Sequence, residues 1–350
     1  MTNRSPTLLR RTATAAVAAC ALAGGALAPA VAQAETWRYA FEEAMEDVQG
    51  KFAQKFKAEI EANSDHTIKL FPFGTLGESA DIMEQTRAGI LQFVDQSPGF
   101  TGSMIPEAQV FFVPYLMPTD QEVASRFFTE SEAVNQMFEG LYAEKGLELL
   151  AMFPEGEVVM TTKEPVKAPQ DLDGVKFRTM TNPLLVESYK AFGATPTPLP
   201  WGEVYGGLQT DIIQGQENPM FWVWSTKMYE VTDYITFTGH NIFTTAVMAN
   251  KEFYDGLPQG EQKMIEDAID VAFDYILEYQ KGLSEESLAK IKEAKPSINV
   301  VRLSEEEREP FKQAAQQVEE RFIEMTGESG EEILAQIKED VKEARQAVSN

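Results

Sequence analysis

An alternation of strand-like and helix-like segments constrains the fold most strongly. Residues 36–41 and 67–71 read as strands, and between them apolar residues recur every four positions, as on one face of a helix. A helix over 78–88, stopped by Gly89, and a third strand over 91–95 continue the alternation. Such an order predicts a parallel sheet with helices on its faces.

The same alternation begins again in the middle of the chain. Residues 175–180 read as a strand, and Asn182 followed by Pro183 supplies a helix cap and a proline at the first helical position. From Gln259 the sequence changes to long amphipathic helices. Two α/β units followed by helices predict two lobes with a cleft between them.

The first 34 residues have the organisation of an export signal. Three arginines precede a mostly apolar segment over 13–28, and Ala32-Gln33-Ala34 matches an A-x-A cleavage site. We expect cleavage after Ala34; the alternative is a lipidation box that ends at Cys20. Because Cys20 is the only cysteine, the exported chain folds without disulfides.

Removal of this signal leaves a large and very acidic chain. Its length is 316 residues (350 minus 34), enough for two domains. The formal charge falls from −25 to about −28, because the signal contains three arginines and no acid (−25 minus 3). Such a charge argues against nucleic acid and anionic membrane surfaces as partners. A well-hydrated acidic surface explains this charge, and the charge by itself does not identify a ligand.

Few groups suited to catalysis are present. The two histidines are His66, expected in a solvated turn over 63–66, and His240. The sequence contains no G-x-S-x-G elbow, H-E-x-x-H helix or Gly-rich phosphate loop. Glu42-Glu43 leaves glycosidase-like chemistry open, although adjacent acids are expected by chance in so acidic a chain. We expect that the chain is not an enzyme and that it binds neither a cofactor nor a metal ion.

Ligands of open α/β sheets bind beyond the carboxyl ends of strands, and residues at those positions are therefore candidates for ligand binding. Glu43 follows the first strand, Arg178 ends the strand of the second unit, and Asn218 follows 212–216. A solvent-facing position remains the alternative for Arg178, since it alternates with apolar neighbours, and for Glu43, since the chain has many surface acids. Four aromatic residues, for which a core position is the alternative, complete the candidates: Phe100, Trp201, Trp222 and Phe243.

Four segments, 73–78, 171–178, 191–196 and 208–219, form a specific pattern in order and spacing. With them, essentially the whole exported chain resembles the substrate-binding proteins of tripartite ATP-independent periplasmic (TRAP) transporters, of the dicarboxylate-binding-protein (DctP) type. Further segments resemble the members that bind ectoine and 5-hydroxyectoine: 37–43, 96–102, 179–185 and 198–203.

The resemblance implies an α/β fold of two lobes, with crossing strands, a hinge and a long lobe-spanning helix, which 259–292 fits. The implied N-terminal lobe is 35–158 plus about 247–283. The implied C-terminal lobe is 159–246 plus about 284–350.

It also implies a site for a zwitterion. Arg178 and Asn218 would hold the ectoine carboxylate, Glu43 would pair with the cationic ring, and the four aromatic residues would enclose that ring. A dry pocket for a zwitterion needs one counter-charge at each end, whereas a dicarboxylate would meet Glu43 as a like charge.

The function implied is that of a periplasmic receptor that captures the compatible solute without chemistry. It would deliver the solute to the small and large integral membrane subunits of the transporter. The alternatives are another zwitterion or monocarboxylate, such as an amino acid or taurine, and a periplasmic enzyme that uses Glu42-Glu43. Presentation of the ligand to a sensor is compatible with transport.

Overall fold

The computed structural model describes residues 35–349, so the expected export signal, its cleavage site and Cys20 lie outside the described residues. The strands are β1 (Thr36–Phe41), β2 (Thr67–Phe71), β3 (Phe93–Gln96), β4 (Leu147–Thr162), β5 (Lys176–Thr179), β6 (Thr195–Pro198), β7 (Gly215–Pro219), β8 (Tyr234–Phe237), β9 (Ile242–Asn250) and β10 (Asn299–Arg302). The α-helices are α1 (Val48–Asn63), α2 (Ser79–Arg87), α3 (Pro98–Thr101), α4 (Gln121–Glu130), α5 (Phe138–Ala143), α6 (Pro183–Ala191), α7 (Val204–Gln209), α8 (Met220–Ser225), α9 (Lys251–Gly256), α10 (Gln259–Tyr279), α11 (Leu283–Ala294) and α12 (Glu305–Ser349).

The predicted alternation at the start of the chain is confirmed. Strands β1 and β2 have the predicted bounds, and α1 buries one face formed by Val48, Phe52, Phe56 and Ile60. In the second unit, α6 begins as predicted after Asn182, whose side chain accepts a hydrogen bond from the Leu185 backbone N–H at 2.9 Å.

The strands form one mixed sheet rather than a parallel one. Their order is β2-β1-β3-β9-β4-β7-β5-β6, with β8 beside β4 and β10 beside β8. Strand β1 is parallel to β2 and β3, and β5 is parallel to β6 and β7, as the alternation predicts. Strands β4 and β9 pass between these two sets and run antiparallel to their partners, so the predicted parallel arrangement holds within each set while the sheet as a whole is mixed.

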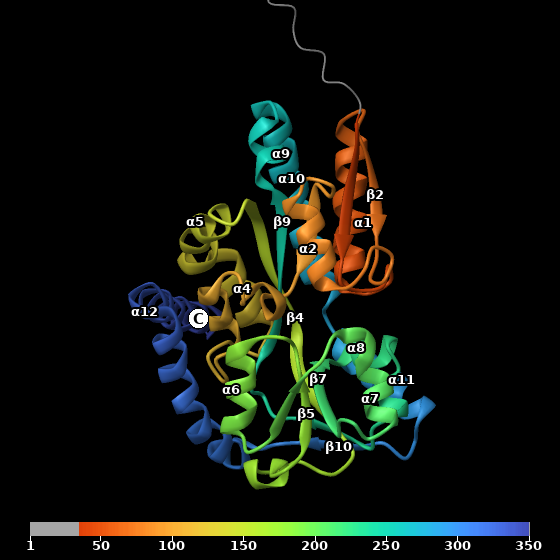
Figure 1. Cartoon of the computed structure of the whole chain (residues 1–350), viewed down its shortest axis with the longest axis vertical. Helices are drawn as coiled ribbons and strands as arrows, with labels where there is room; N and C mark the ends of the chain where they lie inside the picture. Colours follow the sequence, from red (N-terminus) through yellow and green to blue (C-terminus); the bar gives the residue numbers. More distant parts are fainter. Residues whose placement is uncertain (1–34, 350) are drawn as a thin grey trace, which may run out of the picture. The chain divides into compact units, whose positions relative to one another are not determined.

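The long strand β4 joins the two parts of the sheet (Figure 1). Residues 147–157 pair with β9, and residues 158–162 pair with β7 and β8. The register shifts between Pro154 and Gly156, where proline has no amide hydrogen to donate and Gly156 has a φ of +109°. This irregular point lies where β4 exchanges one set of partners for the other.

The helical region predicted over 259–292 is two helices, α10 and α11. Gly282, with a φ of +79°, separates them, and this left-handed conformation ends a helix at little cost only for glycine. Helix α10 packs against α1, whereas α11 packs against α8, so the region contacts both parts of the sheet. A second interruption, at Gly327, divides α12, which packs against α4 and α6.

The expectation of a solvated turn around His66 is wrong. The imidazole is only 5% exposed, it stacks on Trp37 with ring centroids 4.2 Å apart, and its Nδ1 accepts a hydrogen bond from the Glu35 backbone N–H. The turn lies against β1 because Trp37 offers it an aromatic face, which local sequence does not reveal.

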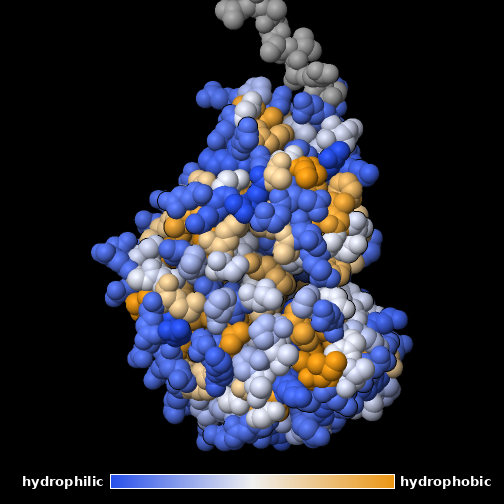
Figure 2. All heavy atoms as spheres, viewed as in Figure 1, coloured by the Kyte–Doolittle hydropathy of each residue, from blue (hydrophilic) through white to orange (hydrophobic). Residues whose placement is uncertain are grey.

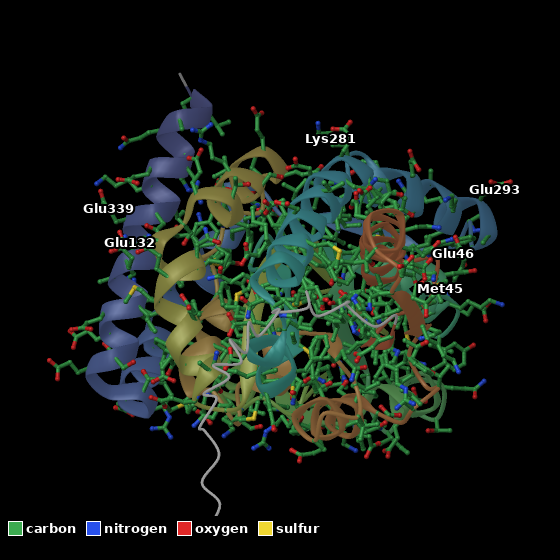
Figure 3. The ribbon with its side chains drawn as sticks, turned by 90° about the horizontal axis from the view of Figure 1, so that it is seen from above. Met45, Glu46, Glu132, Lys281, Glu293 and Glu339 are labelled. Atoms are coloured by element: carbon green, nitrogen blue, oxygen red, sulfur yellow. The ribbon has the colours of Figure 1, made fainter. Side chains whose placement is uncertain are left out.

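The surface agrees with the acidic composition. On the face seen in Figure 2, most side chains are hydrophilic and the apolar ones appear in separate small groups. Charged side chains such as Glu132, Glu293 and Glu339 project outward (Figure 3). Over residues 35–349, every helix is too short or too polar to cross a membrane.

Candidate functional site

One cavity brings together all seven residues nominated from the sequence. It encloses about 420 Å³, part of it open to solvent. The predicted residues in its wall are Glu43, Phe100, Arg178, Trp201, Asn218, Trp222 and Phe243. A larger cavity of about 830 Å³ lies beside the Pro154–Gly156 irregularity of β4 and contains none of these seven.

The topology explains why the polar residues meet. Glu43 follows the carboxyl end of β1, and Arg178 and Asn218 lie near the carboxyl ends of the neighbouring strands β5 and β7. Strand β1 runs opposite to β5 and β7, because β3, β9, β4 and β7 are each antiparallel to the next. The carboxyl ends of the two sets of parallel strands therefore face each other, and ligands of α/β sheets bind beyond such ends. The rule on strand ends therefore identified the polar wall of the cavity.

Arg178 is a buried cation that faces this cavity. Its side chain is 3% exposed, so the alternative of a solvent-facing position is wrong. Nε and Nη2 donate to the carbonyl oxygen of Leu199 at 3.1 and 3.0 Å, and the guanidinium lies 5.4 Å from the Trp201 ring centroid. Burial lowers the pKa of Arg178 to about 10, against the opposing effect of Glu217 and other acids. The guanidinium thus stays charged near neutral pH.

Two adjacent glutamates line the cavity from the end of β1. The Glu42 carboxylate accepts hydrogen bonds from Gln96 Nε2 and the Ser97 backbone N–H, both at 2.9 Å. The Glu43 carboxylate accepts one from the Gln49 backbone N–H at 2.8 Å. Burial raises the pKa of Glu42 to about 7, and burial together with the nearby Glu155 raises that of Glu43 well above its usual range.

The aromatic part of the wall comes from several elements. The rings of Trp201 and Trp222 lie 5.4 Å apart, tilted by 34°. Phe100 in α3 and Phe243 in β9 are half-buried and pack against an adjoining hydrophobic cluster. Their faces border the same space as Arg178 and Glu43, so a planar cation in the cavity would contact π-electron density.

Hydrogen bonds fix Asn218 in the wall. Its Nδ2 donates to Gln216 Oε1 at 2.6 Å, and Gln216 Nε2 donates to Thr161 Oγ1 at 2.6 Å. The amide of Asn218 carries a second hydrogen, which leaves it able to donate to an anion in the cavity.

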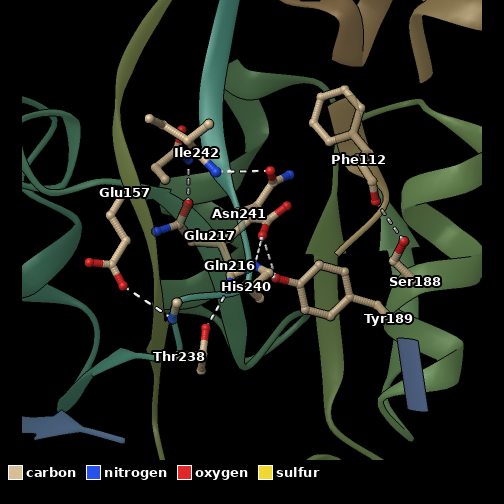
Figure 4. A network of polar contacts seen from close by, with 12 residues as sticks. Phe112, Glu157, Ser188, Tyr189, Gln216, Glu217, Thr238, His240, Asn241 and Ile242 are labelled. Atoms are coloured by element: carbon tan, nitrogen blue, oxygen red, sulfur yellow. Dashed lines mark hydrogen bonds and ion pairs between the residues drawn. The ribbon is translucent and has the colours of Figure 1, made fainter. Parts of the chain in front are cut away.

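The neighbouring residue on β7, Glu217, belongs to a buried network (Figure 4). Tyr189 Oη donates to Glu217 Oε2 at 2.5 Å, and His240 Nε2 lies 2.7 Å from the same oxygen. Thr238 Oγ1 hydrogen-bonds to His240 Nδ1. Glu217 is also the acid that most favours the charged form of Arg178, so the network holds in place a carboxyl group that acts on the guanidinium.

Reasoning from the sequence missed part of the wall. The additional lining residues are Glu42, Gln49, Phe73, Ser79, Met180 and Pro219. Phe73, Met180 and Pro219 lie inside segments that carried the resemblance, so the resemblance could have identified them as site residues. No sequence feature identified Gln49, because it lies in the first turn of α1 and resembles many other polar helix residues.

No cluster of three or more side chains that could hold a metal ion occurs within residues 35–349. What the cavity contains is a guanidinium, two carboxyl groups, an amide and several aromatic faces. These groups can bind a small organic molecule with both a negative and a positive end.

Comparison with known proteins identifies the family. Residues 39–325 match the family described as bacterial extracellular solute-binding protein, family 7 (DctP). The chain is 70% identical over 324 residues to the ectoine/5-hydroxyectoine-binding periplasmic protein UehA of Ruegeria pomeroyi, which covers 92% of this chain and 96% of that protein. It is 62% identical over 311 residues to the ectoine-binding periplasmic protein TeaA of Halomonas elongata, which covers 89% of this chain and 91% of that protein.

A solved structure agrees with both matches. The periplasmic ectoine-binding protein of the TeaABC TRAP transporter of Halomonas elongata superposes with a TM-score of 0.87 at 62% identity, covering 88% of this chain and 99% of that one. The fold and the sequence matches together show that this chain belongs to the DctP family of TRAP-transporter solute-binding proteins, and is therefore a binding protein rather than an enzyme.

Proposed function

We propose that the chain is the periplasmic receptor of a TRAP transporter and that its ligand is ectoine, 5-hydroxyectoine or both. The observation that carries this proposal is the presence of buried Arg178 and buried Glu43 in the wall of one aromatic cavity. High identity to two proteins named for ectoine binding supports the same ligand.

The charges of the cavity favour a zwitterion. Among the described residues, no carboxylate lies within 4.0 Å of the Arg178 guanidinium to form an ion pair, and Glu43 likewise has no cationic partner. A ligand carboxylate would satisfy the outward-facing donors of Arg178 and the free hydrogen of Asn218. The amidinium ring would lie against Glu43, between the aromatic faces.

A dicarboxylate fits the same cavity less well. Its second carboxylate would approach Glu42 and Glu43, and the like charges would repel unless these acids were protonated. Other zwitterions and monocarboxylates, such as amino acids and taurine, remain the competing ligands.

The two-lobed family fold suggests how the ligand is held. We assign residues 35–158 plus about 247–283 to one lobe and 159–246 plus about 284–350 to the other. Glu43 and Phe100 would then contact the ligand from the first lobe, and Arg178, Trp201 and Asn218 from the second. A ligand bridging both would favour a closed form through hinge bending.

The remaining steps follow from the same assignment. Cleavage after Ala34 would release the receptor into the periplasm. The closed form would dock on the small and large integral membrane subunits of the transporter and deliver the solute to them.

Isothermal titration calorimetry tests the ligand. Purified protein lacking residues 1–34 is titrated with ectoine, 5-hydroxyectoine, glutamate, taurine and malate under identical conditions. We expect the tightest binding for ectoine or 5-hydroxyectoine. Tight binding of malate with no heat from ectoine would contradict the proposal. If the protein only binds its ligand, mass spectrometry should find ectoine unchanged after incubation with the protein.

A further inference from the structure

Four carboxyl groups gather around the start of α1 and the irregular point of β4. Glu42, Glu43, Asp47 and Glu155 are all at most 9% exposed. Across residues 35–349, no lysine, arginine or histidine forms an ion pair with any of the four, although Glu46 and Glu148 each pair with a lysine. A buried group of acids without a cation is costly unless some of them carry protons.

Gln49 fixes two of these carboxyl groups beside each other. Its backbone N–H donates to Glu43 Oε2 at 2.8 Å, and its side-chain Nε2 donates to Glu155 Oε1 at 3.0 Å. Thr245 Oγ1 also donates to Glu155 Oε1. Glu155 Oε2, in contrast, is buried and has no hydrogen-bond partner among the described residues, and the nearby Glu155 carboxyl raises the pKa of Glu43. An ionised carboxylate can only accept, so a proton held by one of the pair would supply a donor and relieve the repulsion between the two.

Most of the charged groups around the pair are acids. Asp47 lies at the start of α1, Glu42 at the end of β1, and Asp95 in β3, and each is electrostatically linked to Glu155. Arg178 is a cation in the wall of the same cavity, and among the acids the strongest effect on its pKa comes from Glu217. Full ionisation of the pair would therefore place two negative charges in contact inside an acidic, desolvated pocket.

Only Glu43 of this pair is expected to meet a ligand. Both are buried, but Glu43 lines the ligand cavity, whereas Glu155 lies behind it on β4 and borders the other cavity. Glu155 is thus placed to act on the ligand through Glu43 rather than by contact.

We infer that the Glu43–Glu155 pair shares a proton in the ligand-free protein and yields it to solvent when a cationic ligand binds against Glu43. Glu155 is then a positioning residue that makes solute capture proton-linked. In this step the O–H bond of the carboxyl pair breaks, the proton passes to the buffer, and the ligand cation replaces it without chemical change. The inference rests on the proposed function, since it needs a ligand with a positive ring.

The linkage has a definite sign. Because binding releases a proton, affinity rises with pH, by up to tenfold per pH unit if one whole proton is released. In Glu155→Gln the neighbouring carboxyl is replaced by an amide that still donates a hydrogen bond to Glu43. Glu43 then ionises more readily in the free protein, so fewer protons are released on binding.

Calorimetric titration with ectoine at pH 7, 8 and 9, in buffers of small and large ionisation enthalpy such as phosphate and Tris, counts the protons directly. Wild-type protein is expected to release up to one proton for each ectoine bound, and to bind ectoine more tightly as pH rises. Glu155→Gln is expected to release clearly less and to have a flatter profile. Glu157→Gln is the matched control, because Glu157 lies on the same strand outside the ligand cavity, and it should behave as wild type.

The outcomes separate the two proposals. Ectoine binding by the wild type with equal observed heats in both buffers would overturn the proton-linked inference and leave the proposed ligand standing. Equal proton release by wild type and Glu155→Gln would remove the role of Glu155. A uniform loss of affinity at every pH in Glu155→Gln would mean a merely structural role. Absence of ectoine binding by the wild type would overturn the proposed function and the inference with it. The wild-type measurement alone decides the main point if the variant does not fold.

Discussion

Arg178 donates two hydrogen bonds to the carbonyl oxygen of Leu199, from Nε at 3.1 Å and from Nη2 at 3.0 Å. This contact anchors one edge of the planar guanidinium to the chain just before Trp201. The remaining hydrogens of Nη1 and Nη2 point away from that edge and are available to a ligand carboxylate. The protein thus orients the cation before a ligand arrives, which lowers the entropic cost of binding.

Arg178→Lys should weaken ectoine binding by about 100-fold or more. An ammonium group cannot hold the Leu199 carbonyl oxygen and two ligand oxygens in one plane, and a lost charge-assisted contact in a buried site costs about 2–4 kcal/mol. Calorimetric titration measures the change. Arg302→Lys is the control, since Arg302 is paired with exposed Glu285 outside the ligand cavity. Near-normal affinity in Arg178→Lys would remove the assigned role.

Trp201→Leu should cost less than the loss of Arg178, about 3- to 30-fold in affinity. The substitution keeps apolar contact but removes a π-face, which contributes about 0.5–2 kcal/mol to holding a cation. Trp224→Leu is the matched control, because Trp224 stacks on Tyr229 and does not line the cavity. Equal losses in the two variants would indicate a general effect on packing.

Glu43→Gln should stabilise the ligand-free protein while it weakens ectoine binding. It removes a buried carboxyl group that has no cationic partner among the described residues, and thus part of the acidic repulsion. Urea unfolding with and without ectoine measures both effects. A variant that is less stable without ligand would show that the carboxyl group supports the fold itself.

The pH dependence of stability should reveal the buried acids. An acid whose pKa is raised in the folded state binds more protons there than in the unfolded chain, so the free energy of unfolding falls as pH rises between the two values. For Glu42 this range runs from about 4.3, its unfolded value, to about 7. Urea unfolding at intervals from pH 4.5 to 8 should show declining stability without ligand.

Comparison of variants isolates this contribution from the charge of the whole surface. The decline should be shallower in Glu43→Gln than in the wild type, and unchanged in Glu339→Gln, where the carboxyl is exposed on α12. Identical slopes in all three proteins would assign the decline to surface repulsion alone.

Tyr189→Phe should destabilise the protein by about 1–3 kcal/mol, because a buried carboxylate loses the donor at 2.5 Å. Thermal unfolding measures the loss. Since Glu217 is the acid that most favours the charged form of Arg178, a modest reduction in ectoine affinity should accompany the loss of stability. Tyr254→Phe is a comparison, because Tyr254 Oη donates at 3.0 Å to Glu266, an exposed residue of α10 outside the Glu217 network. An equal effect there would argue against a special role for the Glu217 network.

Local sequence predicted the elements whose pattern is self-contained. The buried face of α1 and the capped start of α6 follow from periodicity and from the Asn182-Pro183 pair. The 16-residue strand β4 and the edge strand β6 had no such signal. β6 contains two prolines, which are tolerated there because an edge strand need not donate every amide hydrogen.

The sequence by itself determined the family, the strand–helix alternation and seven of the residues that line the cavity. Only the tertiary structure decided which groups surround those residues. Gln49 and Glu155 are 106 positions apart, yet their hydrogen bond helps set the charge of Glu43. Periodicity and capping act over a few residues, whereas a buried carboxyl responds to every group packed around it, and that packing exists only once the chain has folded.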